Sequence, residues 1–188
     1  MRHAPYRIDM DAHDRWLVHM GAAVKARDLQ TAQTVLLRPV TRLDERLRGL
    51  FHPCLVAIFD IVRDGPATYA ACEFVQGRSL RLIMGGQPFN GRRASEIVAE
   101  VADGVADLHA RGICHGAITI DTVLLTAKGK SKLDLVPAKE STEAADLDQL
   151  RALFASLLRP SGFGGQALEL PDLASVDSAA LLAAKLRG

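Results

Sequence analysis

The sequence has no excess of charge of either sign. Its 188 residues include 23 Lys and Arg against 22 Asp and Glu, which leaves a formal net charge of +1. Proteins that bind nucleic acid or anionic lipid through their overall charge carry a clear basic excess. We therefore expect no nucleic-acid partner and no electrostatic attachment to a membrane surface.

Cysteines and long apolar runs are scarce as well. Cys54, Cys72 and Cys114 are widely spaced, and no two of them form a Cys-x-x-Cys pair. This pattern is typical of reduced, buried thiols and argues against a disulfide framework or a metal site. The apolar run at 179–184 is too short to span a bilayer, and residues 1–7 lack the apolar segment of a signal peptide. We expect a cytoplasmic protein.

The composition that remains is that of a globular protein, with 48% hydrophobic and 24% charged residues. In the first half of the chain, short apolar runs separated by turn residues predict antiparallel strands. These predicted strands cover residues 16–20, 22–28, 34–39, 55–63 and 68–75, after a loosely packed segment at 1–13. Leu43, Leu47 and Leu50 recur at helical spacing, which predicts one short amphipathic helix at 41–51.

Helical patterns dominate the second half of the chain. The clearest covers residues 94–111, where apolar residues line one face and Gly112 follows as a C-cap. Further helices are predicted at 79–84, 142–159 and 177–186, and a small hairpin at 123–126 and 131–135. Strands first and helices afterwards is an α+β order, and a chain of this length forms one compact domain or two small lobes.

Residues 105–125 resemble the catalytic loop of a protein kinase. The kinase motif is H-R-D-L-x-x-x-N, in which the Asp accepts the proton of the substrate hydroxyl and the Asn holds Mg²⁺. In this sequence His115 stands at the His, Ala117 at the catalytic Asp and Thr122 at the Asn. The apolar frame around the loop is retained, whereas the groups that carry the chemistry are gone.

Further segments resemble bacterial-type serine/threonine kinases in the same order along the chain. Only Gly21 remains of the phosphate-binding G-x-G-x-x-G loop, because Trp16 and Val18 occupy the two earlier glycine positions. Arg38 replaces the Lys that pairs with the ATP phosphates, and Leu36 replaces the small Ala beside adenine. The resemblance therefore implies a nucleotide pocket too altered to bind ATP.

Two further kinase segments are altered. Residues 72–80 resemble the hinge, with Cys72 as gatekeeper and Glu73 after it. The Mg²⁺-binding Asp of the D-F-G motif falls on Leu135 when the residues are counted without a gap, and on Asp134 if one residue has been deleted. The helix that carries the acid paired with the kinase Lys is shortened, and Asp44 or Glu45 could stand in for that acid.

Several polar residues near the loop have structural interpretations. The resemblance implies that His115 braces the loop and that Asp146 holds the loop backbone. Asp121 has the sequence context of a solvated loop residue, although Asp121 and Asp134 together could hold a cation. His52 and His109 are expected to be structural.

The resemblance covers residues 15–160, and two departures stand out. The stretch between Val136 and Thr142 is too short for a full activation loop, and the chain after residue 160 is too short for the remaining kinase helices. Apolar faces that full kinases cover would then lie open. Leu168, Leu170 and Leu173 are candidates for covering such faces within the chain or for contacting a partner.

The sequence as a whole predicts a single kinase-like domain over residues 1–188 with a minimal bilobal α+β fold. The N-lobe is expected at 14–76 and a truncated, mostly helical C-lobe at 77–188. We expect a catalytically inactive pseudokinase that binds and regulates a protein partner, without ATP, cofactor or metal. Two alternatives stay open: an unorthodox ATP-dependent phosphotransferase that uses Arg38, Asp121 and Asp134 in a rebuilt site, and a structural subunit of a larger complex.

Overall fold

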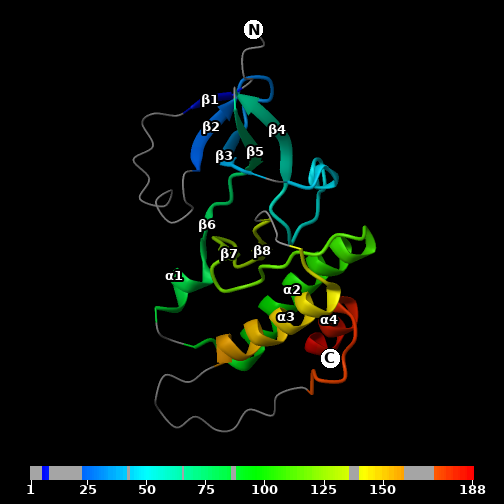
Figure 1. Ribbon diagram of the computed structural model, residues 1–188. Coiled ribbons are helices and arrows are strands. Elements are labelled where there is room, and N and C mark those ends of the chain that lie inside the picture. Colours follow the sequence, from blue (N-terminus) through cyan, green and yellow to red (C-terminus); the bar gives the residue numbers. More distant parts are fainter. Residues whose placement is uncertain are drawn as a thin grey trace. The chain divides into compact units, whose positions relative to one another are not determined.

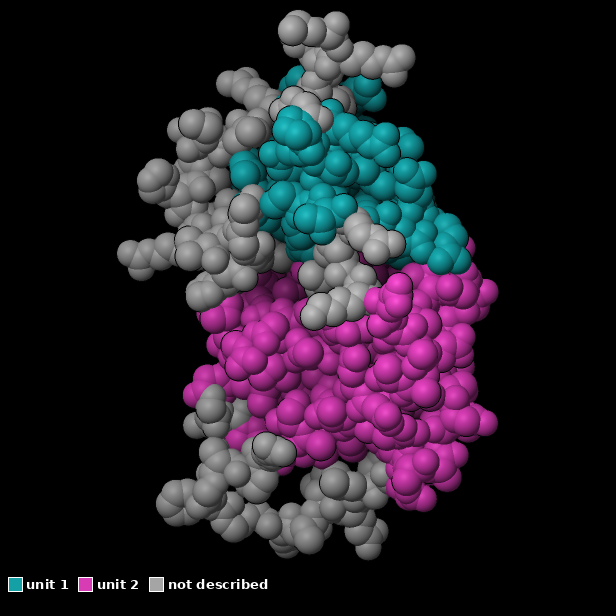
Figure 2. All heavy atoms as spheres, in the orientation of Figure 1, with its two compact units in different colours: residues 1–51, 56–75 teal, residues 52–55, 76–188 magenta. Residues whose placement is uncertain are grey.

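The computed structural model describes residues 6–8, 23–41, 43–64, 66–85, 88–135, 140–158 and 172–188. The predicted strand at 16–20 and the glycine-loop positions Trp16, Val18 and Gly21 lie outside these residues. The chain divides into two compact units, coloured teal and magenta in Figure 2. Unit 1 comprises residues 1–51 and 56–75, and unit 2 comprises residues 52–55 and 76–188. Residues 52–55 thus belong to the second unit, although they lie within the predicted N-lobe.

Unit 1 is built on a five-stranded antiparallel sheet with the strand order β1-β2-β3-β5-β4 (Figure 1). The strands are β1 (Tyr6–Ile8), β2 (Val24–Asp28), β3 (Thr34–Pro39), β4 (Ile58–Asp64) and β5 (Ala67–Glu73). β3 and β5 lie at the centre, and their residues Val35, Leu36, Ala70, Ala71 and Cys72 are buried. β-Branched and aliphatic residues suit such a half-buried pleated surface, which is why the apolar runs at 34–39 and 68–75 predicted these two strands.

The predicted helix at 41–51 is wrong in extent. Only one 3-10 turn forms there, η2 (Glu45–Leu47), and Asp44 caps its start by accepting a hydrogen bond from the backbone N–H of Arg46. Gly49 follows with a φ of 72°, a left-handed conformation that ends a helix. Leu47 and Leu50 are nevertheless buried. The leucine spacing therefore indicated which side of the segment faces the core, and not a continuous helix.

The predicted loose segment at 1–13 contains β1, which pairs with β2 through Tyr6 opposite Asp28 and Ile8 opposite Ala26. Three residues are too few to show an alternating pattern in a sequence. β1 forms because its backbone pairs with the edge of β2, about 20 residues further along the chain, and such a distant partner leaves no local pattern in the sequence.

Among its described residues, unit 2 combines a three-stranded antiparallel sheet with four helices. The strands, in the order β6-β7-β8, are β6 (Gly77–Ser79), β7 (Val123–Thr126) and β8 (Ser131–Leu133). The helices are α1 (Leu80–Met84), α2 (Gly91–Ala110), α3 (Glu143–Leu158) and α4 (Ala179–Arg187). Each of these helices was predicted to within about three residues at either end, which is the usual uncertainty of boundaries read from a sequence.

Helix α2 is the centre of unit 2, where α3 and α4 both pack against it (Figure 1). Its apolar face is fully buried and consists of Ile97, Val98, Val101, Val105 and Leu108. Asn90 caps the helix by accepting a hydrogen bond from the backbone N–H of Arg93 at 2.8 Å. An ion pair between Arg187 and Asp103 joins α4 to α2 on the surface.

The connector before α4 folds back onto α3. Leu173 is buried, and its carbonyl accepts a hydrogen bond from Nε of Arg151 at 3.1 Å. Arg151 also donates to the carbonyl of Val176 at 2.5 Å. Leu173 therefore covers an apolar face within the chain, one of the two roles expected for it, whereas Leu168 and Leu170 lie outside the described residues.

The three cysteines are free thiols, with Cys72 buried and Cys54 and Cys114 half-buried. In the described part of the chain, no helix is both long and apolar enough to cross a membrane.

Gly77 provides a test of the small sheet. A Cβ at this position would lie 2.5 Å from the carbonyl oxygen of Leu125 on β7, closer than any side chain can approach a backbone atom. We predict that Gly77→Ala forces β6 away from β7 and lowers the free energy of unfolding by about 1–3 kcal/mol, as overpacking does elsewhere. Thermal unfolding measures this as a drop of roughly 2–4 °C for each kcal/mol.

Ser79→Ala is the matched control, because Ser79 lies on the same strand and its side chain makes no capping hydrogen bond. Its stability should stay within about 0.5 kcal/mol of the wild type. Equal melting temperatures for Gly77→Ala and Ser79→Ala would show that the two strands do not approach so closely.

Candidate functional site

The segment that resembles a catalytic loop connects α2 to β7 in unit 2. Gly112 follows α2 with a φ of 66°, and its backbone N–H donates to the carbonyl of His109 at 2.8 Å. The left-handed glycine ends the helix, as its position in the sequence predicted. Residues 113–118 then run without regular secondary structure, so side chains must supply the hydrogen bonds that fix the loop.

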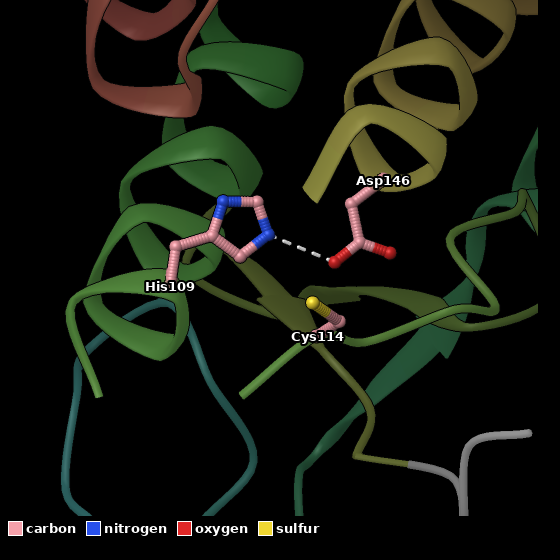
Figure 3. Close-up of side chains that lie close together, drawn as sticks. All are labelled: His109, Cys114 and Asp146. Atoms are coloured by element: carbon pink, nitrogen blue, oxygen red, sulfur yellow. Dashed lines mark hydrogen bonds and ion pairs between the residues drawn. The ribbon is translucent and has the colours of Figure 1, made fainter. Parts of the chain in front are cut away.

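Asp146 supplies two of these hydrogen bonds, and Gln149 on the same helix supplies another by accepting from the backbone N–H of Ile118 at 2.6 Å. Asp146 lies in the first turn of α3 and is completely buried. Its Oδ2 accepts from the backbone N–H of His115 and its Oδ1 from that of Gly116, each at 2.7 Å. His109, at the end of α2, has its Nε2 2.9 Å from Oδ2 (Figure 3). Asp146 therefore holds the loop backbone, as the resemblance implied.

His115 is buried, with 3% of its surface exposed. Its Nδ1 accepts a hydrogen bond from the backbone N–H of Ala117 at 3.2 Å, and its Nε2 lies 2.9 Å from the carbonyl oxygen of Asp134. Because Nδ1 is the acceptor, the proton sits on Nε2 and the ring is neutral. Burial lowers the pKa of His115 below its ordinary value of 6.5, which keeps the ring uncharged at neutral pH. His115 thus braces the loop with both ring nitrogens.

Ala117 and Thr122 are the residues that the sequence resemblance assigned to the positions of the kinase base and metal ligand. Ala117 offers only a methyl group. The Oγ1 of Thr122 donates to the carbonyl of Ala117 at 2.8 Å and accepts from the backbone N–H of Thr119 at 2.9 Å. The one proton of this hydroxyl can also reach the carbonyl of Thr119 at 3.1 Å, so each of these partners orients the hydroxyl toward the loop itself.

The backbone of Asp134 forms hydrogen bonds to the loop through both its N–H and its carbonyl group. Its N–H donates to the carbonyl of Thr122 at 2.8 Å, and its carbonyl faces Nε2 of His115. The side chain of Asp134 is 8% exposed, and Leu135 after it is 4% exposed. Both residues between which the sequence left the metal-ligand position open are therefore buried, and Asp134 contacts the loop through its backbone.

Asp121 is engaged by α1. Its two carboxylate oxygens pair with Nε and Nη2 of Arg81, the second contact at 2.7 Å, and the backbone N–H of Arg81 donates to the carbonyl of Ile120. The hydrogen bond from Arg81 lowers the pKa of Asp121 below its ordinary value. The side chain of Asp121 is 51% exposed, in agreement with the solvated loop residue expected from the sequence. Its pairing with Arg81 was not expected, because 40 residues separate the two.

The other predicted site residues lie in the sheet of unit 1. Leu36 of β3 and Cys72 of β5 are directly opposite one another in register, and Arg38 is buried on the same strand as Leu36. Glu73 is tied to the segment before β4, because Ala57 donates its N–H to the Glu73 carboxylate at 3.3 Å and accepts from the Glu73 N–H at 2.8 Å.

The two acids proposed as partners of the kinase Lys are engaged in surface ion pairs. Asp44 pairs with Arg46 at 2.5 Å, and Glu45 lies 3.6 Å from Arg63. The side chain of Glu45 is 79% exposed, which is unlike the buried acid that a kinase places beside its Lys.

One cluster was missed by sequence reasoning, which found no group of potential ligands. The nearest ligand atoms of His109, Cys114 and Asp146 all lie within 4.8 Å of one another (Figure 3). The 37 residues between His109 and Asp146 hide this proximity. Only the short spacing of His109 and Cys114 at the end of a predicted helix could have indicated it.

We predict that Asp146→Asn destabilises unit 2. An amide nitrogen in place of either oxygen would face backbone N–H donors and leave at least one of them unsatisfied in the interior. Each unmet buried donor costs about 1–3 kcal/mol, which chemical denaturation would detect as a lower unfolding midpoint.

Asp148→Asn is the matched control on the same helix. Its carboxylate is 76% exposed and pairs with Arg151 at 2.6 Å, so its loss should cost less than about 1 kcal/mol. Similar midpoints for the two variants would mean that Asp146 does not hold the loop.

Comparison with known proteins finds similarity to serine/threonine-protein kinases over part of the chain. No family model matches the chain. The chain is 34% identical over 103 residues to serine/threonine-protein kinase PkaB of Streptomyces coelicolor, which covers 54% of this chain and 24% of PkaB. It is 26% identical over 162 residues to serine/threonine-protein kinase PknB of Mycobacterium leprae, which covers 81% of this chain and 26% of PknB. The chain thus spans about a quarter of the length of these relatives.

Among solved structures, residues 1–466 of Rad53 in complex with AMP-PNP superpose with a TM-score of 0.62 over 72% of this chain and 44% of that chain, at 19% identity. Identity this low shows a common fold alone. The antiparallel sheet of unit 1, the mainly helical unit 2 and the loop held by Asp146 agree with that fold. The chain therefore has a protein kinase-like fold in a truncated, bilobal α+β form.

Proposed function

We propose that the chain is a catalytically inactive kinase-like module that regulates a protein partner by binding it. The observation that carries this proposal is the hydrogen bonding of Thr122. Its hydroxyl closes the loop onto the carbonyl of Ala117, at the two positions where a kinase presents its metal ligand and its base. Both functional groups are absent, and the hydroxyl that remains serves the loop backbone.

The energetics of phosphoryl transfer support inactivity. The reaction depends on Mg²⁺ to neutralise charge on the phosphates and on a base to orient the attacking hydroxyl. Loss of general base catalysis alone slows a reaction by about 10²–10⁴-fold. Here the loss coincides with Leu36 and Arg38 in place of the small residue and the Lys that receive the nucleotide. Such losses compound, because each removes a separate contribution to binding or to the transition state.

The retained framework supports a role in binding. Asp146 and His115 still fix the loop, although the loop carries no base. Next to it, Leu82 and Ile83 on α1 are 42% and 37% exposed. Adjacent exposed apolar side chains are typical of surfaces that contact other proteins. A rigid loop with an apolar neighbour suits recognition of a partner better than turnover.

A second candidate function is a phosphotransferase with a rebuilt site. The position of Asp134 beside the loop favours it, because this carboxylate would be one magnesium ligand. Asp121 is a poor second ligand, since Arg81 already neutralises it.

We predict that millimolar ATP with Mg²⁺ raises the melting temperature by no more than about 1 °C, well below the effect of a functional pocket. A ligand at 100 times its dissociation constant would stabilise a protein by about 2.7 kcal/mol, roughly 5–11 °C for this chain length. An active serine/threonine kinase domain, measured in parallel, provides the positive control.

Two results would contradict inactivity and favour the second candidate. One is a saturable shift of several degrees that Arg38→Ala abolishes. The other is phosphate transfer to a generic protein substrate that Asp134→Asn abolishes.

The binding half of the proposal has its own test. The immobilised wild-type chain is used to retain a protein from a lysate of the native host. We predict that the double variant L82S/I83S retains at least about tenfold less of that protein, which corresponds to about 1.4 kcal/mol of binding free energy. Leu29→Ser is the matched control, because Leu29 is 62% exposed but lies in unit 1. Retention that is insensitive to L82S/I83S, or no retained protein, would contradict the proposed role of α1.

A further inference from the structure

Three side chains with different metal-binding groups converge where α2, the loop and α3 meet (Figure 3). His109 lies in the last turn of α2, Cys114 in the loop and Asp146 in the first turn of α3. Their ligand atoms lie within 4.8 Å of one another. An imidazole, a thiol and a carboxylate are each common ligands of Zn²⁺.

The surroundings of the cluster are negatively charged. Besides Asp146, Glu143 approaches His109, with its Oε2 3.9 Å from Nδ1. Burial raises the pKa of the Cys114 thiol above its ordinary value, and the charges of Asp146 and Glu143 raise it further. The negative charges of Asp146 and Glu143 favour a cation at this point, and a bound cation would in turn allow the thiol to ionise.

We propose that His109 Nε2, Cys114 Sγ and Asp146 Oδ2 form a zinc site, with the fourth position open to water. The mixed set of nitrogen, sulfur and oxygen ligands suits a borderline-soft ion of tetrahedral preference. Tetrahedral bonds of about 2.0–2.3 Å place the ligand atoms roughly 3.3–3.6 Å apart. The Sγ of Cys114 must therefore approach by roughly 1 Å, whereas Nε2 of His109 and Oδ2 of Asp146, now 2.9 Å apart, must separate slightly. Cys114 is half-buried in a loop, so rotation of its side chain can supply most of this movement.

The protons balance in this proposal. The proton that His109 Nε2 now donates to Asp146 moves to Nδ1 of the same ring, so the ring stays neutral. The Glu143 carboxylate can approach and accept a hydrogen bond from this Nδ1–H. A carboxylate that receives the second N–H of a metal-bound histidine is a common arrangement. Cys114 releases its thiol proton to solvent. Asp146 keeps its bonds from His115 and Gly116, because each carboxylate oxygen can accept two partners. One proton is therefore released for each zinc bound.

Such an ion would join α2, the loop and α3 at one point, in place of the single hydrogen bond between His109 and Asp146. It would stabilise the loop scaffold without any involvement of Ala117 or Thr122. The proposal therefore stands whether or not the chain has catalytic activity.

The experiment uses the purified full chain without an affinity tag. Zn²⁺ is titrated against a chromophoric chelator, and Co²⁺ serves as a spectroscopic probe. We expect one ion for each chain, a thiolate-to-cobalt charge-transfer band and release of about one proton. Affinity should rise about tenfold for each pH unit while the Cys114 thiol remains protonated. Zinc at 100 times its dissociation constant should raise the melting temperature by roughly 5–11 °C.

Variants decide whether this cluster is the site. Cys114→Ser should abolish the charge-transfer band, whereas Cys54→Ser is the matched control, a half-buried thiol outside the cluster, and should retain it. Glu143→Gln, at a side chain that is 62% exposed, should weaken binding about 10–100-fold, as loss of a carboxylate behind a metal-bound histidine does. The absence of saturable binding, or a band that persists in Cys114→Ser, would overturn the proposal. Unchanged affinity in Glu143→Gln would overturn the role given to that carboxylate.

Discussion

A carboxylate without access to water is costly unless several donors replace its hydration. Asp146 meets this condition through two backbone N–H groups of the loop and the ring of His109. The dependence is mutual, because the same bonds are what give an otherwise irregular segment a single conformation. Much of unit 2 follows from this arrangement. It fixes where α3 begins against the end of α2 and directs His115 toward the strand β8.

The polar side chains of Asp121 and Thr122 are engaged by other groups of the protein. Thr122 bonds to two neighbouring backbone groups, and Asp121 is paired with Arg81. In an active site, some polar groups must remain available to a substrate or a metal, at a cost in stability. Here the occupied groups stabilise the protein itself. The frame and the chemistry of a kinase are thus separable physical requirements, since burial maintains the first and exposed functional groups supply the second.

The sequence predicted the elements whose signals are local. Helix α2 was expected because one apolar face repeats over five turns, and β7 was found at its predicted bounds of 123–126. The strand β6 was not expected, because it depends on β7 as a backbone partner elsewhere in the chain. The predicted helix at 41–51 gave way to the 3-10 turn η2, which Gly49 follows in a left-handed conformation. The loop could be located through its apolar frame. Its ion pair to Arg81 and the proximity of His109 to Asp146 could not, because 40 and 37 residues separate the partners.

The hydrogen bonds that fix the loop also limit which substitutions the loop can accommodate. An Asp at position 117 would add a negative charge to a loop that Asp134 already contacts through its backbone. An Asn at position 122 would remove the hydroxyl that closes the loop on the carbonyl of Ala117. Each substitution alone would therefore carry a cost, and both together would still leave Leu36 and Arg38 unchanged in β3. These costs give a physical reason why the loop, with Ala117 and Thr122 in place, is a stable scaffold.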